Sequence, residues 1–92
     1  MDEKHIEKIK QILTDWNPLG ERAKQITDLE NYEVEAIDIL FFIDKKTSVN
    51  QINKVMVQIL SEAFNLEINM DLSRKYAEMI KKILVEKKST TV

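Results

Sequence analysis

A chain of 92 residues with 43% apolar and 33% charged residues has the composition of one small globular domain, residues 1–92. It contains no cysteine, which excludes disulfides and thiolate chemistry, and a single histidine, which excludes a multi-histidine metal site. One glycine and one proline argue against a turn-rich β fold, and no stretch approaches the roughly 20 apolar residues of a membrane span. The net charge of −2 is unevenly spread, with acids gathered in residues 28–43 and bases in residues 74–88.

The first predicted helix covers residues 2–15, with Asp2 as its N-cap. His5 lies at the edge of the helix's apolar stripe, where we expect a half-buried helix residue and not a ligand. Trp16 ends the stripe one residue before a turn, so we expect its ring to anchor the core. The stripe consists of Ile6, Ile9, Ile12, Leu13 and Trp16.

A specified turn follows this helix. Pro18 biases Asn17 away from helical dihedral angles, and Gly20 can take a positive φ. The next stretch, residues 21–30, is either a short extra helix or an ordered loop.

The most apolar segment predicts a central helix over residues 32–46, capped by Asp28 or Asn31. Its apolar stripe is wide enough to contact several neighbours, while Phe42 projects among polar residues without obvious cover from the chain. The expected core positions are Tyr32, Ala36, Ile37, Ile39, Leu40, Phe41 and Ile43, and the expected polar side holds Glu35, Asp38 and Lys46.

A third helix is predicted over residues 48–64, with Thr47 or Ser48 as its cap. Asn53 falls inside the apolar sector of this helix, where a buried amide must be hydrogen-bonded. A fourth helix is predicted over residues 71–87, capped by Asp71, after a connection that turns Leu66, Ile68 and Met70 inward. Its expected stripe is Leu72, Tyr76, Met79, Ile80, Ile83 and Leu84. The fold class is therefore all-α, a bundle or array of about four helices.

Residues around the turn and the central helix resemble those of the YugE-like family of small bacterial helical proteins. The matching positions are Trp16, Asn17, Pro18 and Leu19, then Tyr32, Glu33, Glu35, Ile37, Asp38, Ile39 and Leu40. Asn17 stands where the family usually has Asp. The resemblance implies a compact all-α fold of about four helices and supplies no catalytic residue.

The residue types present offer little chemistry. No glycine-rich phosphate loop and no EF-hand spacing occurs, so we expect neither an enzyme nor a cofactor or metal site. The charged N-terminus is unlike a secretory signal, which together with the absent cysteines predicts a cytoplasmic protein. The excess of Lys over Arg and the many Ile indicate a bacterial source.

The function expected is binding of a protein partner, by a monomer or weak homodimer. An alternative is an immunity or antitoxin protein that occludes a toxin, and nucleic-acid binding through the basic last helix is less favoured because aromatic residues do not alternate with its lysines. The predicted partner surface is an apolar anchor ringed by acids on the central helix and the preceding connection: Phe42, Glu35, Asp38, Glu33, Glu30 and Asn17.

Overall fold

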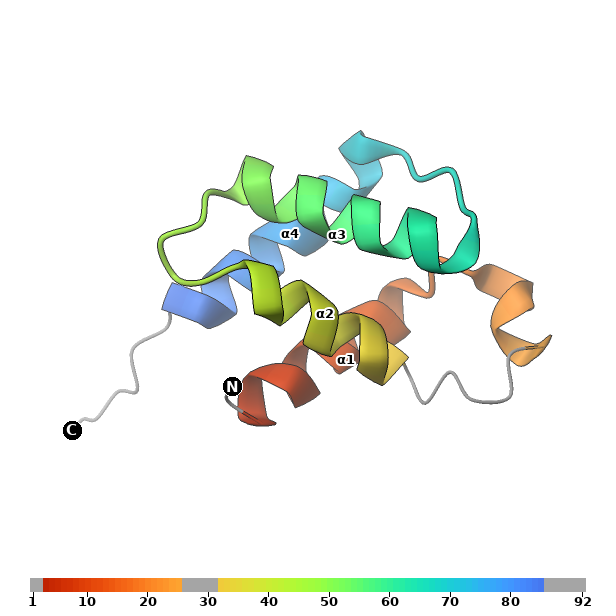
Figure 1. Cartoon of the computed structure of the whole chain (residues 1–92), viewed down its shortest axis with the longest axis horizontal. Helices are drawn as coiled ribbons and strands as arrows, with labels where there is room; N and C mark the ends of the chain where they lie inside the picture. Colours follow the sequence, from red (N-terminus) through yellow and green to blue (C-terminus); the bar gives the residue numbers. More distant parts are fainter. Residues whose placement is uncertain (1–2, 26–31, 86–92) are drawn as a thin grey trace.

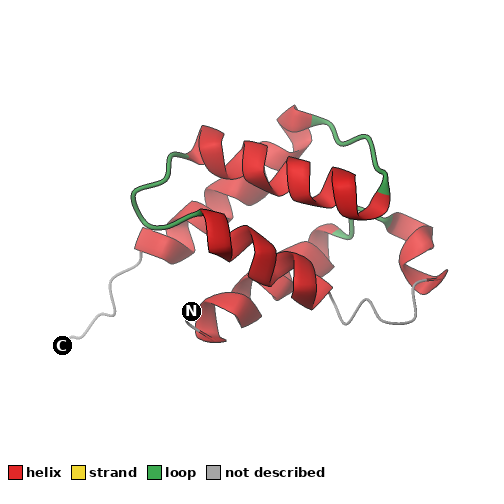
Figure 2. Ribbon diagram, in the orientation of Figure 1, coloured by secondary structure: helices red, strands yellow, loops and turns green. Residues whose placement is uncertain are grey.

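The computed structural model describes residues 3–25 and 32–85, and this part of the chain is helical without a strand. It confirms the all-α fold class (Figure 2). The elements are α1 (Glu3–Trp16), a 3₁₀ helix η1 (Gly20–Gln25), α2 (Glu33–Phe42), α3 (Val49–Phe64) and α4 (Met70–Val85). Part of the predicted extra helix of residues 21–30 is thus a 3₁₀ turn, while residues 26–30, the predicted N-cap Asp2 and the predicted cap residues Asp28 and Asn31 lie outside the described residues.

The four α-helices form a closed ring of contacts. α1 packs against α2 and α4, and α3 packs against the same two helices. In Figure 1, α2 and α3 lie in front of α1 and α4. Each helix therefore has two helical neighbours and one side that turns away from the bundle, so the orientation of each helix decides which side chains remain exposed.

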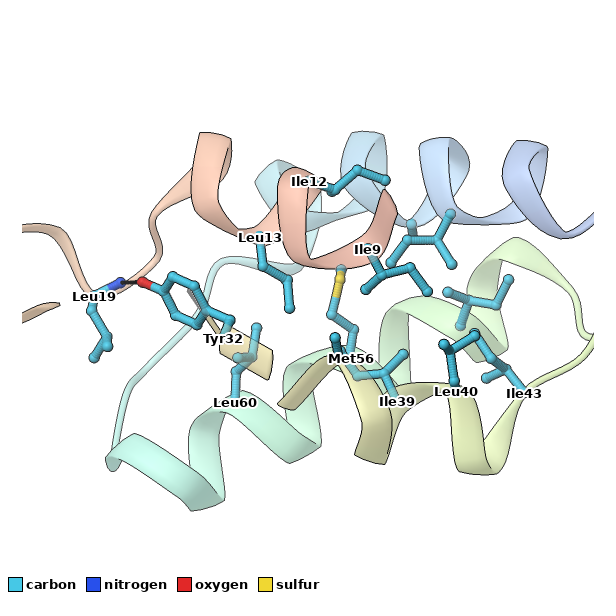
Figure 3. Packing of buried hydrophobic residues seen from close by; sticks show 14 residues of the cluster. Ile9, Ile12, Leu13, Leu19, Tyr32, Ile39, Leu40, Ile43, Met56 and Leu60 are labelled. Carbon is cyan, nitrogen blue, oxygen red and sulfur yellow. Dashed lines mark hydrogen bonds between the residues drawn. The ribbon is translucent and has the colours of Figure 1, made fainter. Parts of the chain in front are cut away.

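The core lies where the four helices face one another. Figure 3 shows Met56 of α3 reaching between Ile9 of α1 and Ile39 of α2, and all three side chains are fully buried. Trp16 is half-buried and stacks on Tyr76 of α4, with ring centroids 4.7 Å apart and planes inclined by 12°. The predicted core anchor therefore lies at the edge of the core, where it joins α1 to α4. The buried apolar residues are Ile9, Ile12, Leu13, Leu19, Tyr32, Ala36, Ile39, Leu40, Ile43, Ile52, Met56, Leu60, Ala77 and Ile80.

The turn after α1 is closed by the side chain that begins α2. Asn17 and Gly20 both have positive φ, 49° and 58°. The Tyr32 hydroxyl donates a hydrogen bond to Asn17 Oδ1 at 2.9 Å and accepts one from the Leu19 N–H at 3.3 Å. The prediction of a specified turn is confirmed, because two polar groups of the turn, Asn17 Oδ1 and the Leu19 N–H, bond the same buried phenol.

α2 is shorter than predicted at both ends. Tyr32 is its N-cap, in the left-handed region with φ 67°, and its side chain makes no capping hydrogen bond. At the other end Ile43 is extended, and Asp44 starts a tight turn whose carboxylate accepts the Lys46 N–H at 2.8 Å while its own N–H bonds Thr47 Oγ1 at 2.9 Å. The predicted end at Lys46 is wrong because these local hydrogen bonds compete with the helical pattern.

The caps of the last two helices follow from short polar side chains. Ser48 caps α3 as predicted, since its Oγ accepts the Gln51 N–H at 3.1 Å. For α4 the predicted cap Asp71 is wrong. Asn69 Oδ1 accepts the Asp71 N–H at 2.8 Å and the Leu72 N–H at 3.2 Å, so the helix begins one residue earlier, at Met70.

α3 and α4 share a buried polar contact. Asn53 is 4% exposed and donates from Nδ2 to the Met70 carbonyl at 3.0 Å. Its Oδ1 accepts a short hydrogen bond from the Ser73 hydroxyl, which is fully buried and also lies 3.1 Å from the Met70 carbonyl. A buried Asn53 was expected to need hydrogen bonds, and Met70 and Ser73 of α4 supply them.

Candidate protein-interaction surface

α2 is apolar on both its buried and its exposed side. The exposed fractions are 72% for Phe41, 64% for Phe42, 55% for Val34 and 37% for Ile37. We call these four residues the aromatic patch. The predicted core positions of Ile37 and Phe41 are therefore wrong, and Phe42, for which the sequence offered no obvious cover, is exposed. The buried residues of α2 are Glu35, Ala36, Ile39 and Leu40.

The two phenylalanines join the patch into one surface. Adjacent residues of a helix project about 100° apart, yet the rings of Phe41 and Phe42 meet edge to face with centroids 5.2 Å apart. Ile37 and Val34 lie one and two turns before Phe41 on the same side of α2. An exposed aromatic pair that continues into aliphatic side chains is a typical binding surface, because single exposed apolar residues are common but connected ones are not.

A groove runs from this patch onto α3. Phe42 forms one wall, Val55 and Ile59 of α3 the other, and the polar side chains Gln58 and Glu62 form the rim, around about 210 Å³. Pockets for drug-sized ligands span about 300–1,000 Å³. The groove is therefore sized for a protruding side chain of a partner and not for a metabolite.

Asp38 is the predicted acid that shares the exposed side of α2 with Phe42, one turn before it. Within the described part of the chain, no hydrogen bond or ion pair engages the Asp38 carboxylate. The predicted combination of an apolar anchor and a free acid is thus present on the outward side of α2.

The remaining predicted surface residues lie elsewhere. Glu33 forms an ion pair with Lys10 of α1 at 3.1 Å, a hydrogen bond that raises the pKa of Lys10. Glu35 is 8% exposed, so its predicted place on a polar side is wrong. Asn17 is held by Tyr32 in the turn after α1, and Glu30 lies outside the described residues.

Sequence reasoning missed Val34, Ile37 and Phe41 as surface residues. The available signal was the length of the apolar run, because a helix that is apolar nearly all round presents more apolar surface than two neighbours can cover. Hydrophobic periodicity could not decide which part stays outside.

A smaller exposed apolar area lies on α4. Leu72 is 63% exposed and Met79 is 45% exposed, so their predicted places in the buried stripe of that helix are wrong. Leu72 borders a hollow of about 140 Å³ that Trp16 and Pro18 also line. This exposed area of α4 lacks the adjacent aromatic side chains of α2, so Leu72 is a matched control for the aromatic patch.

Comparison of the chain with protein-family models, with curated proteins and with solved structures finds no match. The resemblance to the YugE-like family therefore stays a prediction. No helix in residues 3–25 and 32–85 is long and apolar enough to cross a membrane. Within the same residues, no three His, Asp or Glu side chains gather closely enough to hold a metal ion.

Proposed function

We propose that this chain is a non-enzymatic module of the bacterial cytoplasm that binds one folded protein through the aromatic patch. The observation that carries the proposal is the exposure of Phe41 and Phe42 side by side at 72% and 64%. Aromatic side chains are enriched among the residues that contribute most to protein interfaces, since they bury a large apolar area at a low cost in side-chain entropy. An immunity protein is the special case in which the partner is a toxin.

The basic side chains of α4 favour a protein partner over a nucleic acid. Lys81 Nζ donates to the carbonyls of Lys45 at 2.7 Å and Thr47 at 2.6 Å, and thereby joins α4 to the α2–α3 turn. Lys75 lies over the ring of Tyr76, 5.1 Å from its centroid. Cations engaged within the fold are less available for phosphates, which dominate nucleic-acid affinity.

The test is capture of proteins from native bacterial lysate by the immobilised chain, with mass spectrometry as the readout. A Phe41→Gln/Phe42→Gln variant keeps good helix formers in α2 and should lose the partner that the wild type enriches. Leu72→Gln, which removes an exposed apolar side chain from α4, should retain it. Equal capture by the wild type and the double variant would overturn the proposal.

A further inference from the structure

The position of Asp38 beside the aromatic patch constrains the charge of the partner, if the proposed binding function holds. Val34 and Ile37 precede this carboxylate on α2, and Phe41 and Phe42 follow it at three and four residues. The three- and four-residue spacings place Val34, Phe41 and Phe42 next to Asp38 on the helix surface. A partner that covers the patch therefore also removes this carboxylate from water.

Burying a carboxylate without a counter-charge costs several kcal/mol, so the partner has to supply a cation. The patch and its groove contain no base of their own among their described residues: the charged side chains there are Asp38 and Glu62. Arginine is the better counter-charge, because its planar guanidinium binds a carboxylate with two parallel hydrogen bonds.

The shape of the site selects a helix as the partner element. The described residues form no β-sheet, so no sheet edge offers backbone groups for strand addition. Instead, the side chains of α2 and α3 present ridges with a groove between Phe42, Val55 and Ile59. Ridges and grooves of this kind accept the side chains that another helix presents at intervals of three and four residues.

A second copy of the chain fits this surface poorly. A two-fold dimer uses the same residues on both sides. Two copies joined through the aromatic patch would enclose two Asp38 carboxylates and no base from the patch or groove. Two carboxylates enclosed without a counter-charge oppose association, which leaves a different, cationic chain as the occupant.

We propose that the aromatic patch binds an amphipathic helix of another protein, that an apolar side chain of this helix enters the groove beside Phe42, and that an arginine or lysine on the same face pairs with Asp38. The interface is thus an apolar contact with one central ion pair. Glu62, exposed at the rim of the groove, sets a second preference for positive charge along α3.

The experiment is selection from a displayed library of 18-residue helix-forming peptides against the full chain and against Asp38→Arg. Wild type should enrich peptides with apolar residues at positions i, i+3, i+4 and i+7 and an arginine or lysine on the same face. Asp38→Arg should enrich peptides with an acid at that position. A synthetic arginine peptide should bind the Asp38→Arg variant at least about tenfold more weakly than wild type, the loss expected when a buried charge pair is broken.

Three outcomes contradict this inference: the same sequences enriched on both proteins, no helical peptide enriched on wild type, or self-association of wild type through the patch in sedimentation experiments. Circular dichroism of Asp38→Arg establishes that it is folded. Suppose that Phe41→Gln/Phe42→Gln no longer captures the protein that the wild type enriches, while Asp38→Arg selects the same peptides as the wild type. The proposed binding function then stands, and only the inference of a cationic helix as the partner is refuted. If the phenylalanine variant retains its captured protein, the proposed function itself fails.

Discussion

Tyr32 links the two ends of the connection between α1 and α2 through one side chain. Tyr32 is 2% exposed and its ring meets that of Phe64 of α3 edge to face at a centroid distance of 6.1 Å, while its hydroxyl bonds Asn17 and Leu19. Burial is the main reason that the pKa of Tyr32 is raised above its ordinary value of 10.0. The phenol is thus kept neutral in the native state.

Tyr32→Phe should lower the free energy of unfolding by about 1–2 kcal/mol, since the ring still fills the core while the Leu19 N–H and Asn17 Oδ1 lose their partner. Urea unfolding at pH 7 measures the loss. Tyr76→Phe serves as the control, and an unchanged stability of Tyr32→Phe would show that the phenol does not hold the turn.

The raised pKa of Tyr32 also makes stability depend on alkaline pH. A group whose native pKa exceeds its unfolded pKa favours the native state fully below the unfolded value and loses that contribution as pH rises through the native value. Stability of the wild type should therefore begin to fall above about pH 10, and part of this fall should vanish in Tyr32→Phe but remain in Tyr76→Phe. Unfolding followed between pH 8 and pH 11 measures both slopes.

Gly20 is a position where backbone conformation alone sets the cost of a substitution. Its φ is 58°, and a Cβ built there would meet nothing within 4 Å. Gly20→Ala should therefore cost about 1–2 kcal/mol from the left-handed conformation and nothing from crowding. Gly20→Asn should cost less, because asparagine tolerates this region better. Equal stability of all three proteins in thermal unfolding would contradict the prediction.

Within α2, the orientation of the helix divides an apolar sequence into core and surface. Ile39 is fully buried whereas Phe41, two residues later, is 72% exposed. Ile39→Ala should cost about 2–5 kcal/mol, the range for truncating a buried aliphatic side chain. Phe41→Gln should change stability by less than about 1 kcal/mol despite removing a larger apolar group. Chemical denaturation of both variants checks this, and a larger loss for Phe41→Gln would place that ring in the core.

The narrow apolar stripe of α1 was predictable from the sequence, whereas α2 was predictable only in part. In α1 the buried residues Ile9, Ile12 and Leu13 follow directly from spacing. In α2 apolar residues surround most of the helix, so periodicity did not reveal that Glu35 is buried and Phe41 exposed. That choice depends on how α1 and α3 lie against α2, which is tertiary information. Asp38 and Phe42 were surface candidates because they fall on the polar side of the helix. The rest of the patch was not predictable, since its exposure depends on that tertiary arrangement.

At the scale of the whole molecule, the closed ring of helix contacts explains why sequence patterns within single helices gave some wrong predictions of burial. Patterns within one helix predicted Leu72 of α4 as buried, but the helices that α4 packs on in the described part of the chain, α1 and α3, leave Leu72 63% exposed. Polar contacts then join the ring at points that no single helix specifies: Lys10 with Glu33 joins α1 to α2, and Lys81 joins α4 to the α2–α3 turn. Such pairs lie 23 and 36 residues apart, beyond the reach of local sequence patterns.

The buried contact between Asn53 and Ser73 has a consequence for the uniqueness of the fold. If α4 slid along α3 by one turn, it would meet a similar row of aliphatic side chains, but the Asn53 amide and the Ser73 hydroxyl would lose each other in an apolar environment. The contact thus fixes the alignment of α4 on α3, because any sliding leaves two buried polar groups without a hydrogen-bond partner. Asn53→Leu/Ser73→Ala should keep most of its stability yet broaden the methyl resonances of α3 and α4, as alternative alignments come to be populated. Sharp, single methyl signals in that variant would show that apolar packing alone selects the alignment.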